Sequence, residues 1–97
     1  MNKYHIFFTK LANPLKIEII TELRKSPASV SELSKNLKIE QSKLSHALNS
    51  MKCCKIVHDK KDGKQRIYSL NKETILPILK IIDTHEKKFC RCCCCLK

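Results

Sequence analysis

Cysteines carry the most distinctive chemistry in this sequence. Seven occur in 97 residues, and a dense run lies at the C-terminal end, at Cys90 and Cys92 to Cys95. Thiolates are soft ligands that suit Zn, Cd, As or Cu(I), and Arg91 with nearby lysines favours the thiolate form. The run lacks the C-x2-4-C spacing of structural zinc sites, so it predicts a flexible thiol tail able to join across a dimer axis. A redox-sensitive tail, or a tail without function, is the alternative.

Two further cysteines, Cys53 and Cys54, follow a stretch with helical periodicity. Adjacent cysteines are poor disulfide partners and nothing in the sequence signals export, so we expect reduced thiols and a cytoplasmic protein. Because a free cysteine behaves as a small hydrophobe, we expect one of this pair to be buried. Metal ligation by the pair is the second interpretation.

A polar helix face offers a different chemistry. From Gln41 onward, Leu44, Ala47, Leu48 and Met51 form an apolar stripe, and the opposite face carries small hydrogen-bonding side chains with hardly any acid. Such a face can enter the major groove of DNA, where Gln pairs with adenine and Ser or His can donate or accept. Ordinary solvated helix residues are the alternative interpretation. The candidate DNA-binding residues, including cations assigned to phosphates, are Gln41, Ser42, Lys43, Ser45, His46, Asn49, Lys52, Lys64 and Arg66.

The charge balance favours a polyanionic partner. Lys and Arg total 20 against 9 acids, a net charge of +11, although lysine-rich surfaces also simply keep small proteins in solution. We expect no membrane association, because no segment approaches the ~20 apolar residues of a span and the first residues lack a secretory pattern. An enzyme is not expected either, because no nucleophile, base and orienting residue form a recognisable group.

Four helices are predicted ahead of any strand. An apolar helix over 1–11 needs covering, and Asn13-Pro14 opens a second helix that stops near Ser26-Pro27. Ser29 to Glu32 is a capping box that starts a third helix, and a turn at 38–39 leads to the helix from Gln41 to Asn49.

A hairpin and a last helix follow. The only glycine lies in Asp62-Gly63 between two alternating runs, which predicts a β-hairpin whose cations are Lys60, Lys61, Lys64 and Arg66. A helix from Asn71 to roughly Phe89 is predicted with Asn71 or Thr74 as its cap, and it requires Pro77 in its opening turn. Its wide apolar band fits a helix buried against both its own domain and a partner.

These elements predict a mainly α protein with a small β-hairpin, in the order of a dimeric winged helix-turn-helix. The domain is expected to span 1–89, followed by the Cys-rich tail over 90–97.

The sequence resembles the ArsR/SmtB family of metal-responsive repressors. The resemblance runs through 11–20, 29–33 and 41–48 and into the hairpin. It implies a homodimer joined by the first and last helices, bound to a double-stranded DNA operator and released when an effector binds. The sequence departs from the family at Lys38 and Lys55, where glycine is usual, and at Glu40, where a capping serine is usual. Each lysine is therefore expected to adopt a strained backbone at a cost of roughly 1 kcal/mol.

The resemblance also points to possible effector sites. The thiol site of the family's third helix is absent, because Ser34, Lys35 and Asn36 stand in that region. Asp83 and His85 resemble half of a zinc site that some members build across the dimer, with a simple polar helix end as the alternative. The candidate metal ligands are therefore Asp83, His85, Cys90, Cys92, Cys93, Cys94 and Cys95.

The resulting hypothesis is a homodimeric repressor released from its operator by a thiophilic metal or metalloid. Two alternatives stay open. One is a redox-responsive or constitutive regulator with the same fold, and the other is a thiol-rich metal-buffering protein.

Overall fold

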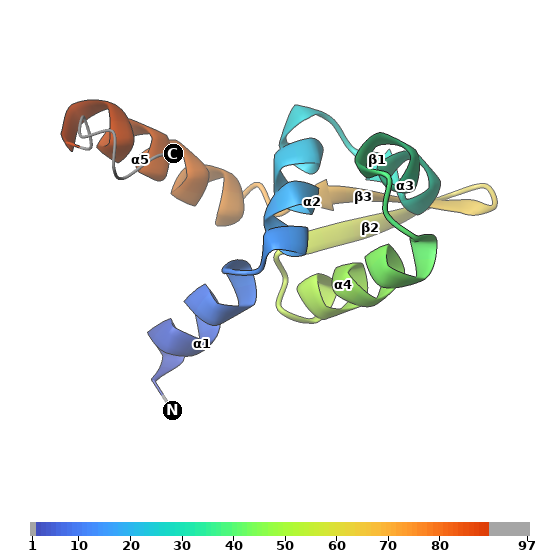
Figure 1. Cartoon of the computed structure of the whole chain (residues 1–97), viewed down its shortest axis with the longest axis horizontal. Coiled ribbons are helices and arrows are strands. Elements are labelled where there is room, and N and C mark those ends of the chain that lie inside the picture. The colour runs from blue at the N-terminus through green and yellow to red at the C-terminus, as the bar shows by residue number, and fades with distance from the viewer. Residues whose placement is uncertain (1, 90–97) are drawn as a thin grey trace.

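The computed structural model describes residues 2 to 89, which form five helices and a small sheet (Figure 1). The elements are α1 (Lys3–Leu11), α2 (Pro14–Lys25), β1 (Ala28–Ser29), α3 (Val30–Leu37), α4 (Gln41–Cys53), β2 (Val57–Asp62), β3 (Gln65–Leu70) and α5 (Ile75–Phe89). This order confirms the predicted winged helix-turn-helix, with α3 and α4 as the helix pair and the β2–β3 hairpin as the wing. The predicted tail over 90–97 lies outside the described residues.

The sheet contains one strand that the sequence did not predict. Its order is β1-β3-β2, with both pairs antiparallel, and β1 contributes only Ala28 and Ser29 opposite Tyr68 and Ile67. Two residues after a proline are too short to produce an alternating pattern, which explains the omission. The hairpin is confirmed: Asp62 pairs with Gln65, and Gly63 turns between them with a φ of 65° that favours glycine.

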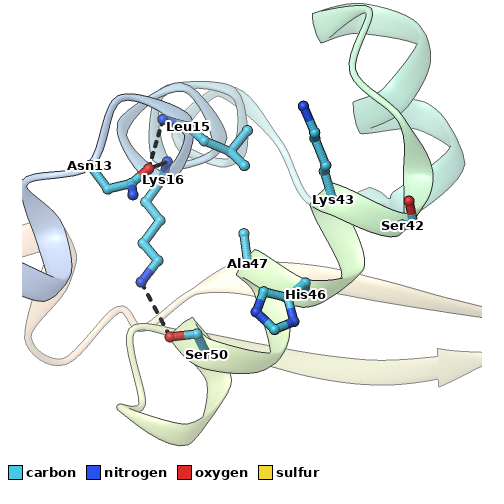
Figure 2. Close-up of a pocket in the computed structure, with 8 residues that line it drawn as sticks. All are labelled: Asn13, Leu15, Lys16, Ser42, Lys43, His46, Ala47 and Ser50. Carbon is cyan, nitrogen blue, oxygen red and sulfur yellow. Dashed lines mark hydrogen bonds between the residues drawn. The ribbon is translucent and has the colours of Figure 1, made fainter.

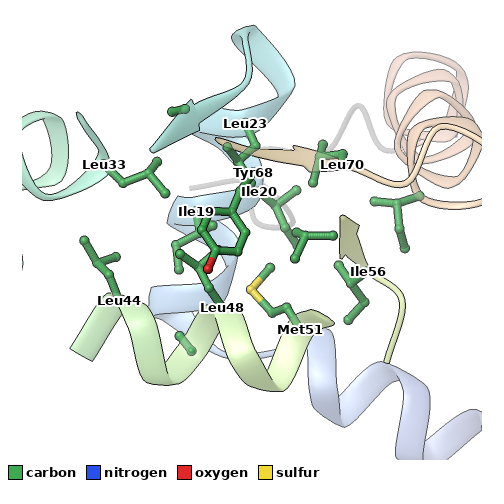
Figure 3. Close-up of a cluster of buried hydrophobic side chains, with 14 residues drawn as sticks. Ile19, Ile20, Leu23, Leu33, Leu44, Leu48, Met51, Ile56, Tyr68 and Leu70 are labelled. Carbon is green, nitrogen blue, oxygen red and sulfur yellow. The ribbon is translucent and has the colours of Figure 1, made fainter. Parts of the chain in front are cut away.

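The core joins α2, α4 and the sheet (Figure 3). The predicted stripe of α4 is confirmed, since Leu44 and Leu48 are fully buried and Met51 is 1% exposed. These side chains pack with Ile19 of α2 and with Tyr68 of β3. Burial of this stripe fixes the rotation of α4, so the opposite side of the helix must face outward.

Helix starts follow the expected capping chemistry. The Asn13 side chain accepts hydrogen bonds from the backbone of Leu15 and Lys16, with Pro14 in the first turn of α2. Ser29 and Glu32 form the predicted capping box of α3. The last helix begins at Ile75, directly after Thr74, the second of the two expected caps, and Pro77 lies in its opening turn as predicted. Asn71 lies ahead of the helix and accepts a hydrogen bond from the Glu73 N–H at 2.9 Å.

Both α1 and α5 project from the end of the body opposite the wing (Figure 1). Among the described residues, α1 buries none of its side chains and α5 buries only Ile75. Large apolar side chains remain exposed on both helices: Tyr4, Ile6, Phe8, Ile81, Ile82 and Phe89. The described part of the chain therefore covers α1 only at Phe7 and Leu11, which are half-buried against the core.

Candidate nucleic-acid interface

The candidate DNA-reading residues lie on the outward side of α4. Gln41, Ser42, Lys43, His46 and Asn49 are exposed, and Ser45 is half-buried. The first turn of α4 contains no acidic side chain. The exposed members of this set are therefore accessible to a ligand, and Ser45 is partly so.

The turn that aims α4 has a strained backbone. Lys38 has a φ of 58° and a ψ of 45°, the left-handed conformation expected where lysine replaces glycine. The Ser34 hydroxyl donates to the Ile39 carbonyl at 2.6 Å and holds the turn closed. The expectation at Lys55 is confirmed as well, since its φ is 61°. Glu40 forms no side-chain cap hydrogen bond within residues 2–89, as its departure from serine implied.

A polar cleft lies between the start of α2 and the outward side of α4 (Figure 2). Its volume is about 450 Å³, and Ser42, Lys43 and His46 of α4 line it. Lys16 reaches across from α2 and donates to the Ser50 hydroxyl at 3.2 Å. Sequence reasoning missed Lys16 because its partner lies 34 positions away and no local pattern marks the pair.

A second cleft connects α4 to the wing. It has a volume of about 360 Å³, and its lining includes Ser45 of α4 together with Lys64 and Arg66 of the wing. The start of α3 contributes Ser31, and the wing also contributes Gln65, neither of which was predicted. Residues predicted separately on α4 and on the hairpin therefore share one surface.

Asp59 at the base of the wing was not anticipated as part of this surface. Its Oδ2 accepts a hydrogen bond from Lys52 Nζ at 3.0 Å and another from Arg66 Nη1 at 2.7 Å. The bond from Lys52, and then the bond from Arg66, hold the pKa of the Asp59 carboxyl below its ordinary value of 3.8, against partial desolvation that would raise it. Two cations assigned to phosphate contacts are thus already paired with an acid.

The possible effector residues are not gathered into one site. Asp83 forms an ion pair with Arg24 of α2 at 2.7 Å. The His85 ring instead packs against the Phe89 ring, with 5.2 Å between the two ring centroids. No group of three or more His, Cys, Asp or Glu side chains with metal-binding geometry occurs in the part of the chain that the structure describes. Cys90 and Cys92 to Cys95 lie outside that part. A complete metal site would therefore need ligands from the tail or from a second copy.

The expected burial of one cysteine of the adjacent pair is wrong. Both Cys53 and Cys54 are exposed. The helix ends at Cys53, and the left-handed turn at Lys55 then brings Ile56 into the core, where it is 1% exposed. Ile56, and neither cysteine, therefore supplies the buried side chain that follows α4.

Comparison with known proteins identifies the family. A family model described as bacterial regulatory protein, arsR family, matches residues 13–59, from the start of α2 into β2. Over 60 residues the chain is 35% identical to the HTH-type transcriptional regulator NmtR of Mycobacterium tuberculosis, covering 62% of this chain and 50% of that protein. Over 79 residues it is 24% identical to the transcriptional repressor SmtB homolog of Synechocystis sp., covering 81% and 60%. The chain belongs to the ArsR/SmtB family.

A solved structure supports the fold over most of this ArsR/SmtB chain. The crystal structure of M. tuberculosis Rv0081 superposes with a TM-score of 0.77 at 30% identity, covering 84% of this chain and 82% of that one. The chain spans only about half to three fifths of the length of the two curated relatives. Both relatives carry the names of transcriptional regulators. Residues 2–89 contain no helix with the length and apolarity that crossing a membrane demands.

Proposed function

We propose that this chain is a homodimeric transcriptional repressor that reads operator DNA with α4 and grips the backbone with its wing. The observation that carries the proposal is the shared surface on which Ser45 of α4 meets Lys64 and Arg66 of the wing. A helix with polar side chains beside a cationic hairpin matches the groove and the backbone of one duplex.

Each side chain has a role set by its chemistry. Gln41 can pair with adenine through two hydrogen bonds, and Ser42 and His46 can donate to or accept from base edges. Lys43 and Lys64 neutralise phosphates, which fixes register without reading sequence. The unpredicted Lys16 joins them, because its ammonium group lines the cleft beside Ser42 and His46.

The dimer is proposed to form through α1 and α5. Ile6 and Phe8 on α1 and Ile82 on α5 are between 44% and 58% exposed. A groove of about 620 Å³ runs between the two helices and is lined mainly by apolar surface, including Phe7, Phe8 and Ile78. A nine-residue helix without buried side chains is marginal alone in water, so a second copy would stabilise it. Two copies would also present two α4 helices to a partly palindromic operator.

The effector is proposed to be a thiophilic metal or metalloid held by Cys90 and Cys92 to Cys95, with Asp83 and His85 as further ligands. Support comes from the density of thiols in the sequence and from the family resemblance. Metal binding at Asp83 would compete with its ion pair to Arg24 and so would weaken one contact between α5 and α2. An effector can shift the dimer only by its difference in affinity between the DNA-binding and the released conformations.

DNA binding is tested by selecting duplexes from a random pool and measuring affinity by fluorescence anisotropy over a range of salt concentrations. We expect one enriched, partly palindromic sequence and a steep salt dependence, with a slope of about −0.9 for each phosphate neutralised. Lys64→Ala should flatten the slope by about 0.9 per protomer. The matched control is Lys72→Ala, which removes an exposed lysine ahead of α5, away from the wing, and should leave the slope unchanged. Absence of any enriched sequence contradicts the proposal.

Effector release is tested with reduced protein purified without oxygen. Zinc, cadmium, arsenite and copper(I) are titrated into the complex with the selected duplex, and at least one is expected to dissociate it. Replacing the tail cysteines by serine should abolish the response. Release by mild peroxide alone would favour the redox alternative, and no release by any agent would contradict effector control.

A further inference from the structure

A single carboxylate connects the DNA-reading helix to the wing. Asp59 Oδ2 receives hydrogen bonds from Lys52 at 3.0 Å and from Arg66 at 2.7 Å. The Asp59 side chain is 10% exposed, whereas those of Lys52 and Arg66 are 46% and 57% exposed. The acceptor is therefore covered while both cations keep about half of their surface open to a ligand.

The three residues come from three different elements. Lys52 lies in the last turn of α4, Asp59 lies on β2 opposite Tyr68, and Arg66 lies on β3 opposite Lys61. Arg66 thus reaches Asp59 diagonally across the hairpin. Within residues 2–89, no other ion pair joins α4 to the wing. We name this group the Asp59 clasp.

The clasp has two opposing effects on a phosphate ligand. An acid beside two cations lowers their general attraction for any DNA backbone. It also restricts long side chains that otherwise occupy many rotamers, so less conformational entropy is lost when they meet phosphates in one fixed arrangement. Because phosphate contacts set the register of a protein on the duplex, fixed cations hold α4 in one position over the base edges.

We propose that Asp59 is a positioning residue that determines specificity, because it fixes Lys52 and Arg66 so that α4 discriminates between base sequences. The inference rests on the proposed function of DNA binding. Asp59, whose side chain is only 10% exposed, acts through the two cations and not by contacting a base itself. The proposal predicts that Asp59 raises the ratio of affinities for the preferred and for unrelated DNA sequences, while it lowers the affinity for DNA in general.

The test compares Asp59→Asn with Asp62→Asn in the full chain. Both variants remove one negative charge from the wing, but Asp62 is exposed and forms no ion pair in the described part of the chain. The probes are the duplex that the wild type selects from a random pool and a scrambled duplex of equal length and composition. Affinity for each is measured from 50 to 300 mM salt, and thermal unfolding is followed by circular dichroism.

We expect Asp59→Asn to bind the scrambled duplex more tightly than the wild type, with a salt slope steeper by about 0.9 for each phosphate newly contacted. The ratio of affinities for the selected and scrambled duplexes should fall about tenfold, the effect of losing one well-placed base contact. Asp62→Asn should tighten both complexes similarly and preserve the ratio. Asp59→Glu, which keeps the carboxylate, should restore much of the lost discrimination.

A ratio that is the same in Asp59→Asn and Asp62→Asn would overturn the proposal. A lower melting temperature for Asp59→Asn with an unchanged ratio would also overturn it, since it would leave the clasp a purely structural role. If the wild type itself does not prefer the selected duplex over the scrambled one, the proposed function fails first. That outcome is distinguishable because it is seen before any variant is made.

Discussion

The exposed aromatic ring of Phe8 provides a direct test of the proposed dimer. Phe8 is 58% exposed in the single chain, on a helix whose described side chains are all outside the core. Complete burial of a phenylalanine side chain contributes roughly 1.5–3 kcal/mol, so covering the exposed share contributes about 1–1.7 kcal/mol per chain. A symmetric dimer buries two such rings. Phe8→Ala should therefore weaken the dimer by about 2–3.5 kcal/mol, or roughly 30- to 300-fold in the dissociation constant.

The assay is sedimentation equilibrium at several loading concentrations, which gives the dimer dissociation constant directly. Alanine retains the helix propensity of α1, so the loss is not a consequence of a broken helix. Thr9→Ala is the matched control, because Thr9 is an exposed polar neighbour on the same helix. Circular dichroism at high protein concentration should show similar helix content for all three proteins.

An unchanged dissociation constant for Phe8→Ala would refute the reasoning, since α1 would then lie outside the interface. A comparable weakening by Thr9→Ala would also count against it, because the effect would then come from α1 itself and not from the area that the ring covers.

Three further predictions concern stability. Lys38→Gly should stabilise the fold by about 1 kcal/mol and raise the melting temperature by several degrees, because glycine adopts a φ of 58° without strain. Lys35→Gly, inside α3, should instead lower the melting temperature. Leu48→Ala should cost about 2–5 kcal/mol in urea denaturation because Leu48 is fully buried, whereas Asn49→Ala on the outward side should change little. The folded-state pKa of Asp59 is depressed, so its contribution to stability is complete above the unfolded pKa near 3.8 and is lost as pH falls through the lower folded value. The free energy of unfolding, measured by denaturation between pH 5 and pH 2, should therefore fall less steeply with falling pH in Asp59→Asn than in the wild type. An identical pH dependence in the two proteins would be inconsistent with the clasp.

Periodicity and turn chemistry predicted most of the fold. The stripe of α4 could be found because helix geometry repeats every 3.6 residues, and the same count gave the outward side of that helix. The capping box at Ser29 and the hairpin at Gly63 are local signals that depend on residues within four positions of each other. Resemblance to the family predicted the left-handed backbone of Lys38 and Lys55 from the glycines they replace.

Contacts between distant residues were beyond these signals. The bond from Lys16 to Ser50 and the ion pair from Arg24 to Asp83 depend on how helices pack, which no local spacing encodes. The Asp59 clasp depends on the register of β2 against β3 and on the position of the last turn of α4. The burial of one cysteine was predicted wrongly because it was inferred from the hydrophobic character of the thiol alone, whereas the position of Cys53 and Cys54 at the end of α4 leaves both exposed. Ile56 occupies the core instead.

The two ends of the chain and its middle have separate tasks in this architecture. The two clefts and the clasp are built by residues 13–70, and the buried core by residues 19–75, whereas the exposed apolar parts of α1 and α5 extend from either side and lie opposite the wing (Figure 1). In the proposed dimer, substitutions on α1 and α5 would therefore change which chains pair without altering the bases that α4 is proposed to contact. Several regulators of this kind could share one cell, each excluding the others from mixed dimers through its own terminal helices. The same separation makes the chain suited to chimeras, in which this central segment is joined to the terminal helices of a relative to combine one operator preference with another assembly partner.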